Sequence, residues 1–183
     1  MRIITGIYKG RKLETPIGRD VRPTGDKVKE AIFSILMAEV PGAVCVDLFA
    51  GTGNLGLEAL SRGADFCHFC DNDRTSIGII KRNIAHCGAE EKARVHACDY
   101  MNFLRKMAEP ADIFFLDPPY HAGLYEKCLE TIDTLDLLSE QGIIVAEHEK
   151  GTVLPQDVGR LGIVSVHRYG KTCVTLYAYR EEK

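Results

Sequence analysis

The tetrapeptide Asp117-Pro118-Pro119-Tyr120 follows an apolar run at residues 113–116 and has the residue types to bind an amino group. Two successive prolines remove two backbone donors and fix φ, so a strand cannot continue through them. They also hold Asp117 and Pro118 extended. The Asp117 carboxylate and the Pro118 carbonyl can then both accept hydrogen bonds from an NH2 group, while the Tyr120 ring stacks on a planar base. Taken alone, an Asp-Pro-Pro sequence is better explained as a rigid turn.

A glycine-rich stretch at residues 47–56 supplies a second candidate site, directly after another apolar run. Glycines let the backbone turn tightly and approach a ligand closely at the start of a helix. Asp71 follows Gly51 by about 20 residues, the spacing at which a carboxylate can accept hydrogen bonds from both ribose hydroxyls of a nucleoside. The stretch therefore predicts a nucleoside-containing cofactor, and a functional interpretation of Asp117 becomes the favoured one.

Two cofactor classes fit this loop. Gly51, Gly53 and Gly56 satisfy the dinucleotide fingerprint G-x-G-x-x-G, so a nicotinamide-dependent dehydrogenase is an alternative. Asp47, however, puts a negative charge where a pyrophosphate would prefer none and where a cationic sulfonium ligand with an ammonium group would be tolerated. The chain is also short for a second nucleotide-binding half. We therefore expect S-adenosylmethionine.

Asp99 ends a third apolar run and can accept a hydrogen bond from the adenine amino group, although it could equally cap a helix starting at Tyr100. The expected cofactor site consists of Asp47, Phe49, Gly51, Gly53, Asn54, Asp71, Asn72, Asp99 and Tyr100.

Apolar runs and helical patterns alternate in a way that brings these residues to one edge of a sheet. Runs typical of strands occur at 43–48, 65–70, 93–97, 113–116 and 143–146. Helical patterns occur at 26–39, from the glycine loop to about Arg62, after the capping residue Asp73, and at 124–136. This alternation predicts an α/β fold whose parallel sheet is covered on both faces. Residues 164–167 and 172–179 predict a final antiparallel hairpin.

The basic residues concentrate at the front of the chain. Residues 1–29 carry eight Lys/Arg and three Asp/Glu, which leaves 15 against 23 for the rest. We expect a basic hairpin at residues 2–15, turning at Lys9-Gly10, within an extension over residues 1–25. The main domain is expected over 26–183. A basic arm on an acidic body suggests an anionic partner, although a merely solvated surface fits the charge as well.

Composition excludes several protein classes. The first residues lack a signal pattern, and no apolar stretch approaches the ~18 residues of a membrane span. Seven cysteines in no secreted-domain spacing indicate a reducing compartment, and we expect a cytoplasmic protein. Cys67-x-x-Cys70 lacks a second ligand pair and would point to opposite faces of a strand, so no metal is expected. His148, between Glu147 and Glu149, is interpreted as part of an acidic strand end.

With these residues described, the chain resembles the bacterial small-subunit rRNA guanine-N2 methyltransferases, and the resemblance is nearly end to end. The opening residues 1–13 resemble the family's hairpin, and Arg22-Pro23-Thr24 with residues 26–33 resembles its second motif. Residues 47–53 and 57–64 resemble its cofactor loop and helix, residues 115–120 its catalytic motif, and residues 169–172 its closing hairpin. Asp71 stands where a glutamate is more usual.

The resemblance implies a Rossmann-like class I methyltransferase fold with a seven-stranded, mostly parallel sheet. It also implies transfer of a methyl group from S-adenosylmethionine to the N2 amine of a guanine in 16S rRNA. We expect Asp117, Pro118, Pro119 and Tyr120 to form the catalytic site, and a monomer that binds rRNA or the small ribosomal subunit. The residues expected to contact RNA are Arg2, Lys9, Arg11, Lys12, Arg22 and Thr24.

The tetrapeptide itself leaves other amino-methylases open. A DNA adenine-N6 or cytosine-N4 methylase and a protein glutamine methylase could use the same four residues. The basic arm favours nucleic acid over protein, and no separate DNA-reading domain is visible. A catalytically idle RNA-binding module is disfavoured because the cofactor and catalytic motifs are both intact.

Overall fold

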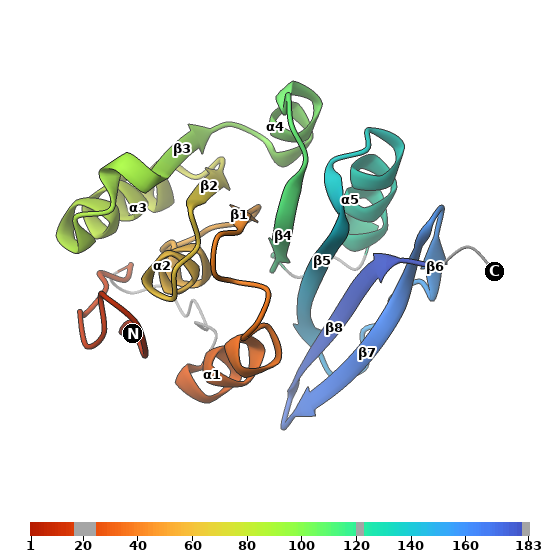
Figure 1. Cartoon of the computed structure of the whole chain (residues 1–183), viewed down its shortest axis with the longest axis horizontal. Helices are drawn as coiled ribbons and strands as arrows, with labels where there is room; N and C mark the ends of the chain where they lie inside the picture. The colour runs from red at the N-terminus through yellow and green to blue at the C-terminus, as the bar shows by residue number, and fades with distance from the viewer. Residues whose placement is uncertain (17–24, 120–122, 181–183) are drawn as a thin grey trace.

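The structure of the chain, a computed structural model, describes residues 1–16, 25–119 and 123–180. One sheet crosses the molecule, with helices on both sides of it (Figure 1). Its strands are β1 (Val44–Asp47), β2 (Phe66–Asp71), β3 (Ala93–Ala97), β4 (Ala111–Leu116), β5 (Leu138–Glu149), β6 (Asp157–Val158), β7 (Leu161–Tyr169) and β8 (Thr172–Tyr179). Among the described residues, no helix is long and apolar enough to cross a membrane.

The strand order is β3-β2-β1-β4-β5-β8-β7-β6. Strands β1 to β5 pair in parallel, and β8, β7 and β6 add to the β5 edge in antiparallel fashion. The α/β prediction and the closing hairpin are therefore confirmed. Within the described residues the sheet has eight strands rather than seven, because the two-residue β6 pairs with the start of β7.

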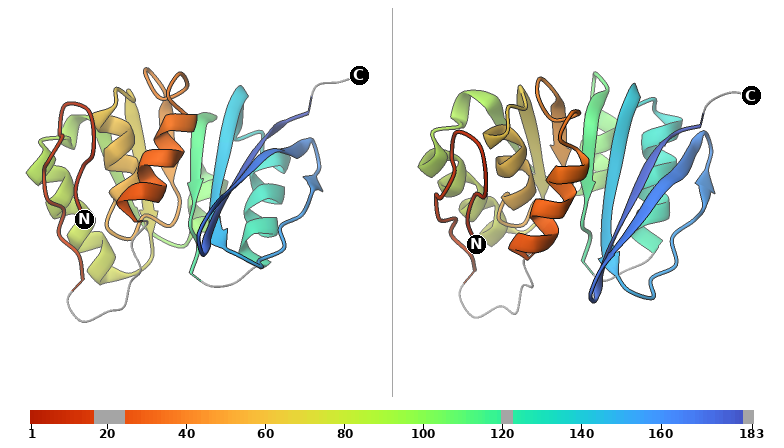
Figure 2. Two further views of the ribbon diagram at one scale, coloured as in Figure 1. Left: turned by 90° about the horizontal axis from the view of Figure 1, so that it is seen from below. Right: turned by 60° about the horizontal axis from the view of Figure 1, so that its bottom comes forward.

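Helices cover the sheet in two layers (Figure 2). One layer holds α1 (Asp26–Ile35), α2 (Asn54–Ser61) and α3 (Arg74–Cys87), and the other holds α4 (Tyr100–Lys106) and α5 (Gly123–Thr134). Alternate residues of β4 serve the two layers: Phe115 packs with Phe33 of α1, whereas Phe114 lies in the cluster that contains Leu129 of α5. Each face of the sheet thus has its own apolar core.

Helix boundaries follow local chemistry. The Asp73 carboxylate accepts a hydrogen bond from Ser76 N at 2.8 Å, so α3 is capped as predicted. The helix predicted over 26–39 instead ends at Ile35. Residues 36–40 form turns that lead into Pro41, and the residue before a proline is disfavoured in the helical region.

The N-terminal segment, residues 1–16, folds back on itself as the expected antiparallel hairpin, with turns at residues 5–10. An isolated bridge joins Arg2 to Lys12, and the two arms exchange main-chain hydrogen bonds: Ile3 N donates to the Arg11 carbonyl at 3.0 Å and Gly10 N to the Ile3 carbonyl at 2.8 Å. The segment also bonds to α2, since Ile7 N donates to the Ser61 carbonyl at 2.9 Å. At Gly6, φ is +88° and an added Cβ would lie 1.7 Å from that carbonyl oxygen, so the close approach requires glycine.

A buried ionic cluster fastens this segment to α1 and α2. Lys29 and Glu58 have no exposed surface, and Lys29 Nζ lies 3.0 Å from Glu58 Oε2. Lys29 Nζ also donates to the Arg2 carbonyl and to Asn54 Oδ1, both at 2.6 Å. Glu58 accepts hydrogen bonds from Ile4 N and Thr5 N. The segment is therefore an integral part of the helical layer.

Candidate active site

A cleft of about 1420 Å³ opens at the carboxyl ends of β1, β2, β4 and β5. The chain passes from β1 to β2 on one side and later places β4 on the other, so the strand order reverses there. Open α/β sheets bind ligands at such a reversal. The cleft is lined by most of the predicted cofactor and catalytic residues: Asp47, Phe49, Gly51, Asn54, Asp71, Asn72, Asp99, Tyr100, Asp117, Pro118 and Pro119.

The glycine loop joins β1 to α2 and forms one wall. Gly51 N donates to Asp71 Oδ2 at 2.8 Å, which ties the loop to the end of β2. Gly53 is not among the described residues that line the cleft, but it shapes the loop. Its N–H donates to the Ala50 carbonyl at 2.7 Å, and a Cβ at this position would lie 3.3 Å from the Phe69 ring. Its φ of +78° is a conformation that glycine adopts without steric cost.

Asp47 lies beneath this loop and is 3 % exposed. Its Oδ2 accepts a hydrogen bond from Gly56 N at 3.0 Å. Burial raises the pKa of this carboxyl to about 7, against the lowering effect of the Gly56 bond. A cation bound nearby would favour the ionised form, so this site electrostatically suits a positively charged ligand.

Asp71 is held in a fixed orientation at the end of β2. One carboxylate oxygen accepts from Gly51 N, and the other accepts from Asp73 N at 2.9 Å. Each oxygen keeps a further lone pair, which can accept a hydroxyl hydrogen. Asp71 and the adjacent Asn72 both line the cleft. The geometry fits a ribose diol, the donor pair expected from the sequence.

An aromatic and acidic wall stands beside Asp71. The rings of Phe49 and Tyr100 pack with centroids 5.3 Å apart, and both line the cleft. Asp99 Oδ1 accepts from Met101 N at 2.9 Å, so it caps α4 and also faces the cleft. Both alternatives for Asp99 therefore remain compatible with its position. The two rings provide an apolar surface suited to an adenine.

Asp117 follows β4 on the opposite side of the glycine loop. Its side chain is exposed where it faces the open cleft. The protein atoms that surround the cleft, followed by the nearby Glu147 and Asp47 carboxylates, raise its pKa above the usual range. Hydrogen-bond donors or a cation placed in the cleft would stabilise its ionised form. Tyr120 lies outside the described residues.

The end of β5 forms a wall that the sequence analysis did not assign to the site. Glu147 and His148 line the cleft, together with Tyr125 of α5. The Tyr125 hydroxyl donates to the Glu147 carbonyl, and His148 Nε2 lies 2.8 Å from Thr175 Oγ1. These contacts fix the strand end. The sequence predicted an acidic strand end here, but it did not predict that this end lies beside Asp117.

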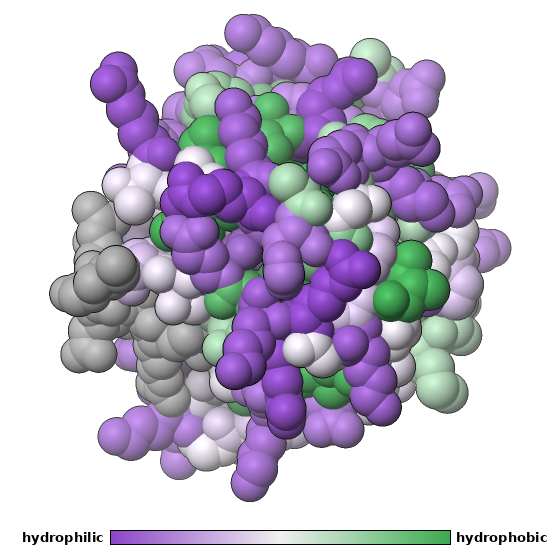
Figure 3. All heavy atoms as spheres, turned by 90° about the vertical axis from the view of Figure 1, so that its left-hand side faces the viewer, coloured by the Kyte–Doolittle hydropathy of each residue, from purple (hydrophilic) through white to green (hydrophobic). Residues whose placement is uncertain are grey.

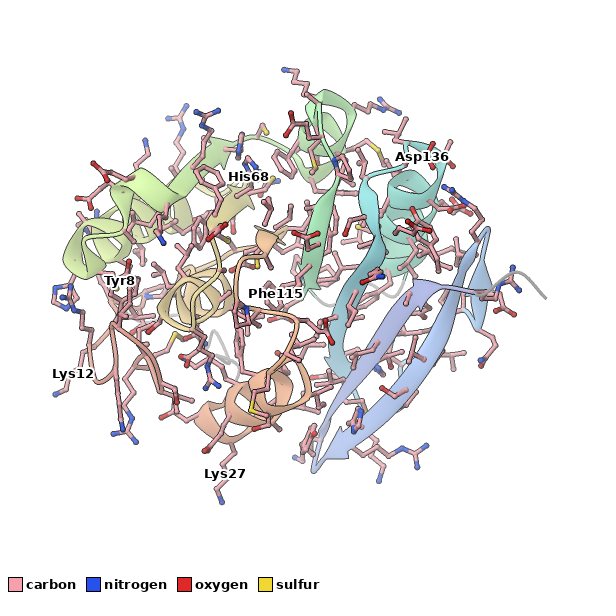
Figure 4. The ribbon with its side chains drawn as sticks, in the orientation of Figure 1. Tyr8, Lys12, Lys27, His68, Phe115 and Asp136 are labelled. Atoms are coloured by element: carbon pink, nitrogen blue, oxygen red, sulfur yellow. The ribbon has the colours of Figure 1, made fainter. Side chains whose placement is uncertain are left out.

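The predicted RNA-contacting residues that the structure describes lie on the N-terminal segment. Lys9 and Lys12 are exposed, and Lys12 points away from the ribbon (Figure 4). Arg2 pairs with Asp26 at 3.4 Å. Arg11 donates to the His86 carbonyl and lies over the Tyr8 ring, so it also stabilises the fold. Arg22 and Thr24 lie outside the described residues.

The surface on this side of the molecule is largely hydrophilic, with apolar residues scattered singly among polar ones (Figure 3). A polar, basic segment of this kind suits a solvated polyanion better than an apolar protein surface.

Cys67 and Cys70 belong to opposite faces of β2. Cys67 lies in the core on the α1–α3 side, and Cys70 lies in the core on the α4–α5 side. Burial raises the pKa of both thiols. The two sulfurs therefore cannot converge on one metal ion, which agrees with the alternation expected for a strand.

The sheet order and the cleft at its reversal define a Rossmann-like methyltransferase fold. A structure titled "Putative methyltransferase yhhF from Escherichia coli" superimposes with a TM-score of 0.88 at 32% identity, covering 100% of this chain and 99% of that one. A second structure, titled as that of "putative methylase HI0767 from Haemophilus influenzae", gives a TM-score of 0.82 at 32% identity and covers 98% of each chain.

The chain belongs to the protein family described as conserved hypothetical protein 95, which matches residues 1–178. "Putative rRNA methyltransferase YlbH" of Bacillus subtilis is 41% identical over 98% of this chain and 100% of its own length. Ribosomal RNA small subunit methyltransferase D of Escherichia coli K12 is 38% identical over 85% of this chain and 78% of its own length.

Proposed function

We propose that this protein transfers a methyl group from S-adenosylmethionine to the N2 amine of a guanine in 16S rRNA. The observation that carries the proposal is the placement of Asp117 and Pro118 across one cleft from the glycine loop and Asp71. The relatives named as small-subunit rRNA methyltransferases support the substrate class.

The residues at the ends of β1, β2 and β3 fit the methyl donor. Asp71 accepts hydrogen bonds from the two ribose hydroxyls, and Asp99 accepts one from the adenine amino group. Phe49 and Tyr100 flank the adenine ring, and Asp47 offers a negative charge toward the cationic end. When bound, S-adenosylmethionine supplies an electrophilic methyl group on a sulfonium.

The residues that follow β4 act on the acceptor base. Asp117 and the Pro118 carbonyl accept hydrogen bonds from the two hydrogens of the amine. This contact draws the nitrogen toward sp3 character, so its lone pair becomes available out of the ring plane. The methylated amine then releases one proton to solvent. Tyr120 stacks on the base, and Pro119 keeps the turn rigid. Positioning and electrostatic stabilisation carry the rate, without a covalent intermediate on the protein.

The RNA is held by the basic residues of the N-terminal extension over residues 1–25. A stacked base cannot reach the bottom of the cleft, so the target guanine is unpaired or flipped out of its helix. We assign RNA contact to Arg2, Lys9, Arg11, Lys12, Arg22 and Thr24.

The test is transfer of a tritiated methyl group by the purified protein to rRNA from a strain that lacks it. The RNA is offered both free and in the small subunit, and the product is digested to nucleosides. The proposal predicts N2-methylguanosine in the 16S rRNA. Recovery of N6-methyladenosine instead, or label only in added DNA or protein, would contradict it.

A further inference from the structure

Glu147 lies level with Asp117 on the neighbouring strand. Strands β4 and β5 run parallel, with Phe115 opposite Val145 and Leu116 opposite Ala146. Continuing this register by one residue sets Glu147 beside Asp117. Neighbouring strands are about 4.8 Å apart, so the two carboxylates start from adjacent backbone positions.

The two side chains also belong to the same face of the sheet. Phe115 and Val145 both lie in the core on the α1–α3 side, whereas Leu116 and Ala146 lie in the core on the other side. Because side chains alternate along a strand, the residues two positions after Phe115 and Val145 return to the first face. Asp117 and Glu147 line the same cleft, as this alternation requires.

The electrostatics of the cleft agree with this placement. Among neighbouring charges, Glu147 contributes most to raising the pKa of Asp117, after the loss of water. Burial and then Asp117 and Glu147 also raise the pKa of Tyr125. The Tyr125 hydroxyl bonds to the main-chain carbonyl of Glu147, and both Glu147 and Asp117 line the cleft. The cleft thus holds two neighbouring carboxylates, and N–H donors of a ligand would stabilise their ionised forms.

We propose that Glu147 determines the base specificity by accepting a hydrogen bond from the ring N1–H beside the amine that Asp117 holds. This inference rests on the proposed function and names a residue outside the Asp117–Tyr120 tetrapeptide. Guanine alone among the common bases carries a ring N–H next to its exocyclic amine. Adenine and cytosine carry a bare ring nitrogen at the equivalent place, and its lone pair would face the carboxylate, which accepts but cannot donate when ionised.

The experiment compares two RNAs that keep the amine in place. Small-subunit rRNA is joined from synthetic and transcribed segments, with either guanine or 2-aminopurine at the methylated position. 2-Aminopurine retains the C2 amine but has no N1–H. Each RNA is presented free and assembled with ribosomal proteins, and kcat/KM for methyl transfer is measured.

Wild-type protein should prefer guanine over 2-aminopurine by about ten- to hundredfold, the range for one hydrogen bond to a charged group. Glu147→Gln should bring the two RNAs to within about threefold, because the amide can donate to a bare N1 or accept from N1–H. Glu149→Gln makes the same chemical change two residues along β5, at a position beyond the level of Asp117. It should retain the wild-type ratio. Affinity for S-adenosylhomocysteine should be unaltered in Glu147→Gln, which checks that the variant is folded.

The possible results separate this inference from the proposed function. If wild-type protein methylates both RNAs equally, or if Glu147→Gln keeps the wild-type preference, Glu147 does not select the base, and guanine methylation still stands. If the guanine RNA receives no methyl group or receives it on another base, the proposed function itself fails. The wild-type comparison is informative on its own, so the inference stays testable even if Glu147→Gln does not fold.

Discussion

Replacing Glu58 by alanine should destabilise the protein far more than a typical substitution. Glu58 has no exposed surface, and its oxygens accept from four donors: Ile4 N at 2.9 Å, Thr5 N at 3.1 Å, Arg62 Nε at 2.9 Å and Lys29 Nζ at 3.0 Å. Lys29 is equally buried. Burial lowers the pKa of its ammonium group, and the nearby Glu58 carboxylate offsets part of that lowering.

The dominant cost is the charge left behind. Removing one partner of a buried ion pair costs about 3–5 kcal/mol, because the remaining ion stays out of water without compensation. The amides of Ile4 and Thr5 would also lose their acceptor, at about 1–3 kcal/mol each if they stayed buried. The N-terminal segment can avoid that second cost by releasing from α2. We therefore expect a loss of about 3–5 kcal/mol, with the amides of Ile4 and Thr5 exchanging early.

The assay is denaturant unfolding followed by circular dichroism, combined with hydrogen exchange. The double variant Lys29→Met, Glu58→Leu removes both charges and keeps similar volumes, so it should be more stable than Glu58→Ala alone. A loss below about 1 kcal/mol in Glu58→Ala, with the Ile4 and Thr5 amides still protected, would refute the reasoning. A double variant less stable than Glu58→Ala would also refute it.

Three further predictions concern the cleft and the basic segment. Asp71→Ala should weaken S-adenosylhomocysteine binding by about 1–3 kcal/mol in calorimetry, and an unchanged affinity or tight binding of NAD would defeat the cofactor assignment. Lys9→Gln with Lys12→Gln should weaken RNA binding and flatten its salt dependence, whereas neutralising Lys106 and Lys127 on the opposite helical layer should not; an unaltered slope would mean that Lys9 and Lys12 are merely solvated. Burial raises the pKa of Asp47 from its ordinary value to about 7, so the folded state binds the extra proton and the unfolding free energy of the ligand-free protein should fall as pH rises from about 4 through about 7. Asp47→Asn should abolish that decline, and a stability difference between the two proteins that is constant over this range would contradict the assignment.

Strands whose apolar residues continue or alternate over their whole length were predicted from the sequence almost to the residue. Ala93–Ala97 and Thr172–Tyr179 match the observed β3 and β8. β5 was predicted only over 143–146, although it spans Leu138–Glu149. Its ends contain polar residues, of which Glu140, Gln141 and Glu149 are exposed, so they carry no apolar pattern; the strand is held there by pairing of Leu138 with β4 and of residues 147–149 with β8.

The site residues also differ in how far local sequence patterns could identify them. Asp47 and Asp117 could be located because each ends an apolar run that leads into a glycine loop or a pair of prolines, and Asp71 because it ends a run at the ribose-binding distance from Gly51. Glu147 also ends an apolar run, but no such motif follows it, and its relation to Asp117 depends on the register between two strands far apart in the chain. The N-terminal hairpin was predicted from its local pattern, but its hydrogen bonds to Ser61 were not, since they are tertiary contacts.

The most direct test of the account is the methyl-transfer rate of Asp117→Ala compared with its affinity for S-adenosylhomocysteine. Asp117 is proposed to contact only the acceptor amine, so turnover on small-subunit rRNA should fall by at least about 100-fold while the affinity stays at the wild-type value. The rate is measured in single-turnover experiments with tritiated donor and nucleoside analysis of the product. Formation of N2-methylguanosine by Asp117→Ala at the wild-type rate would contradict the central claim.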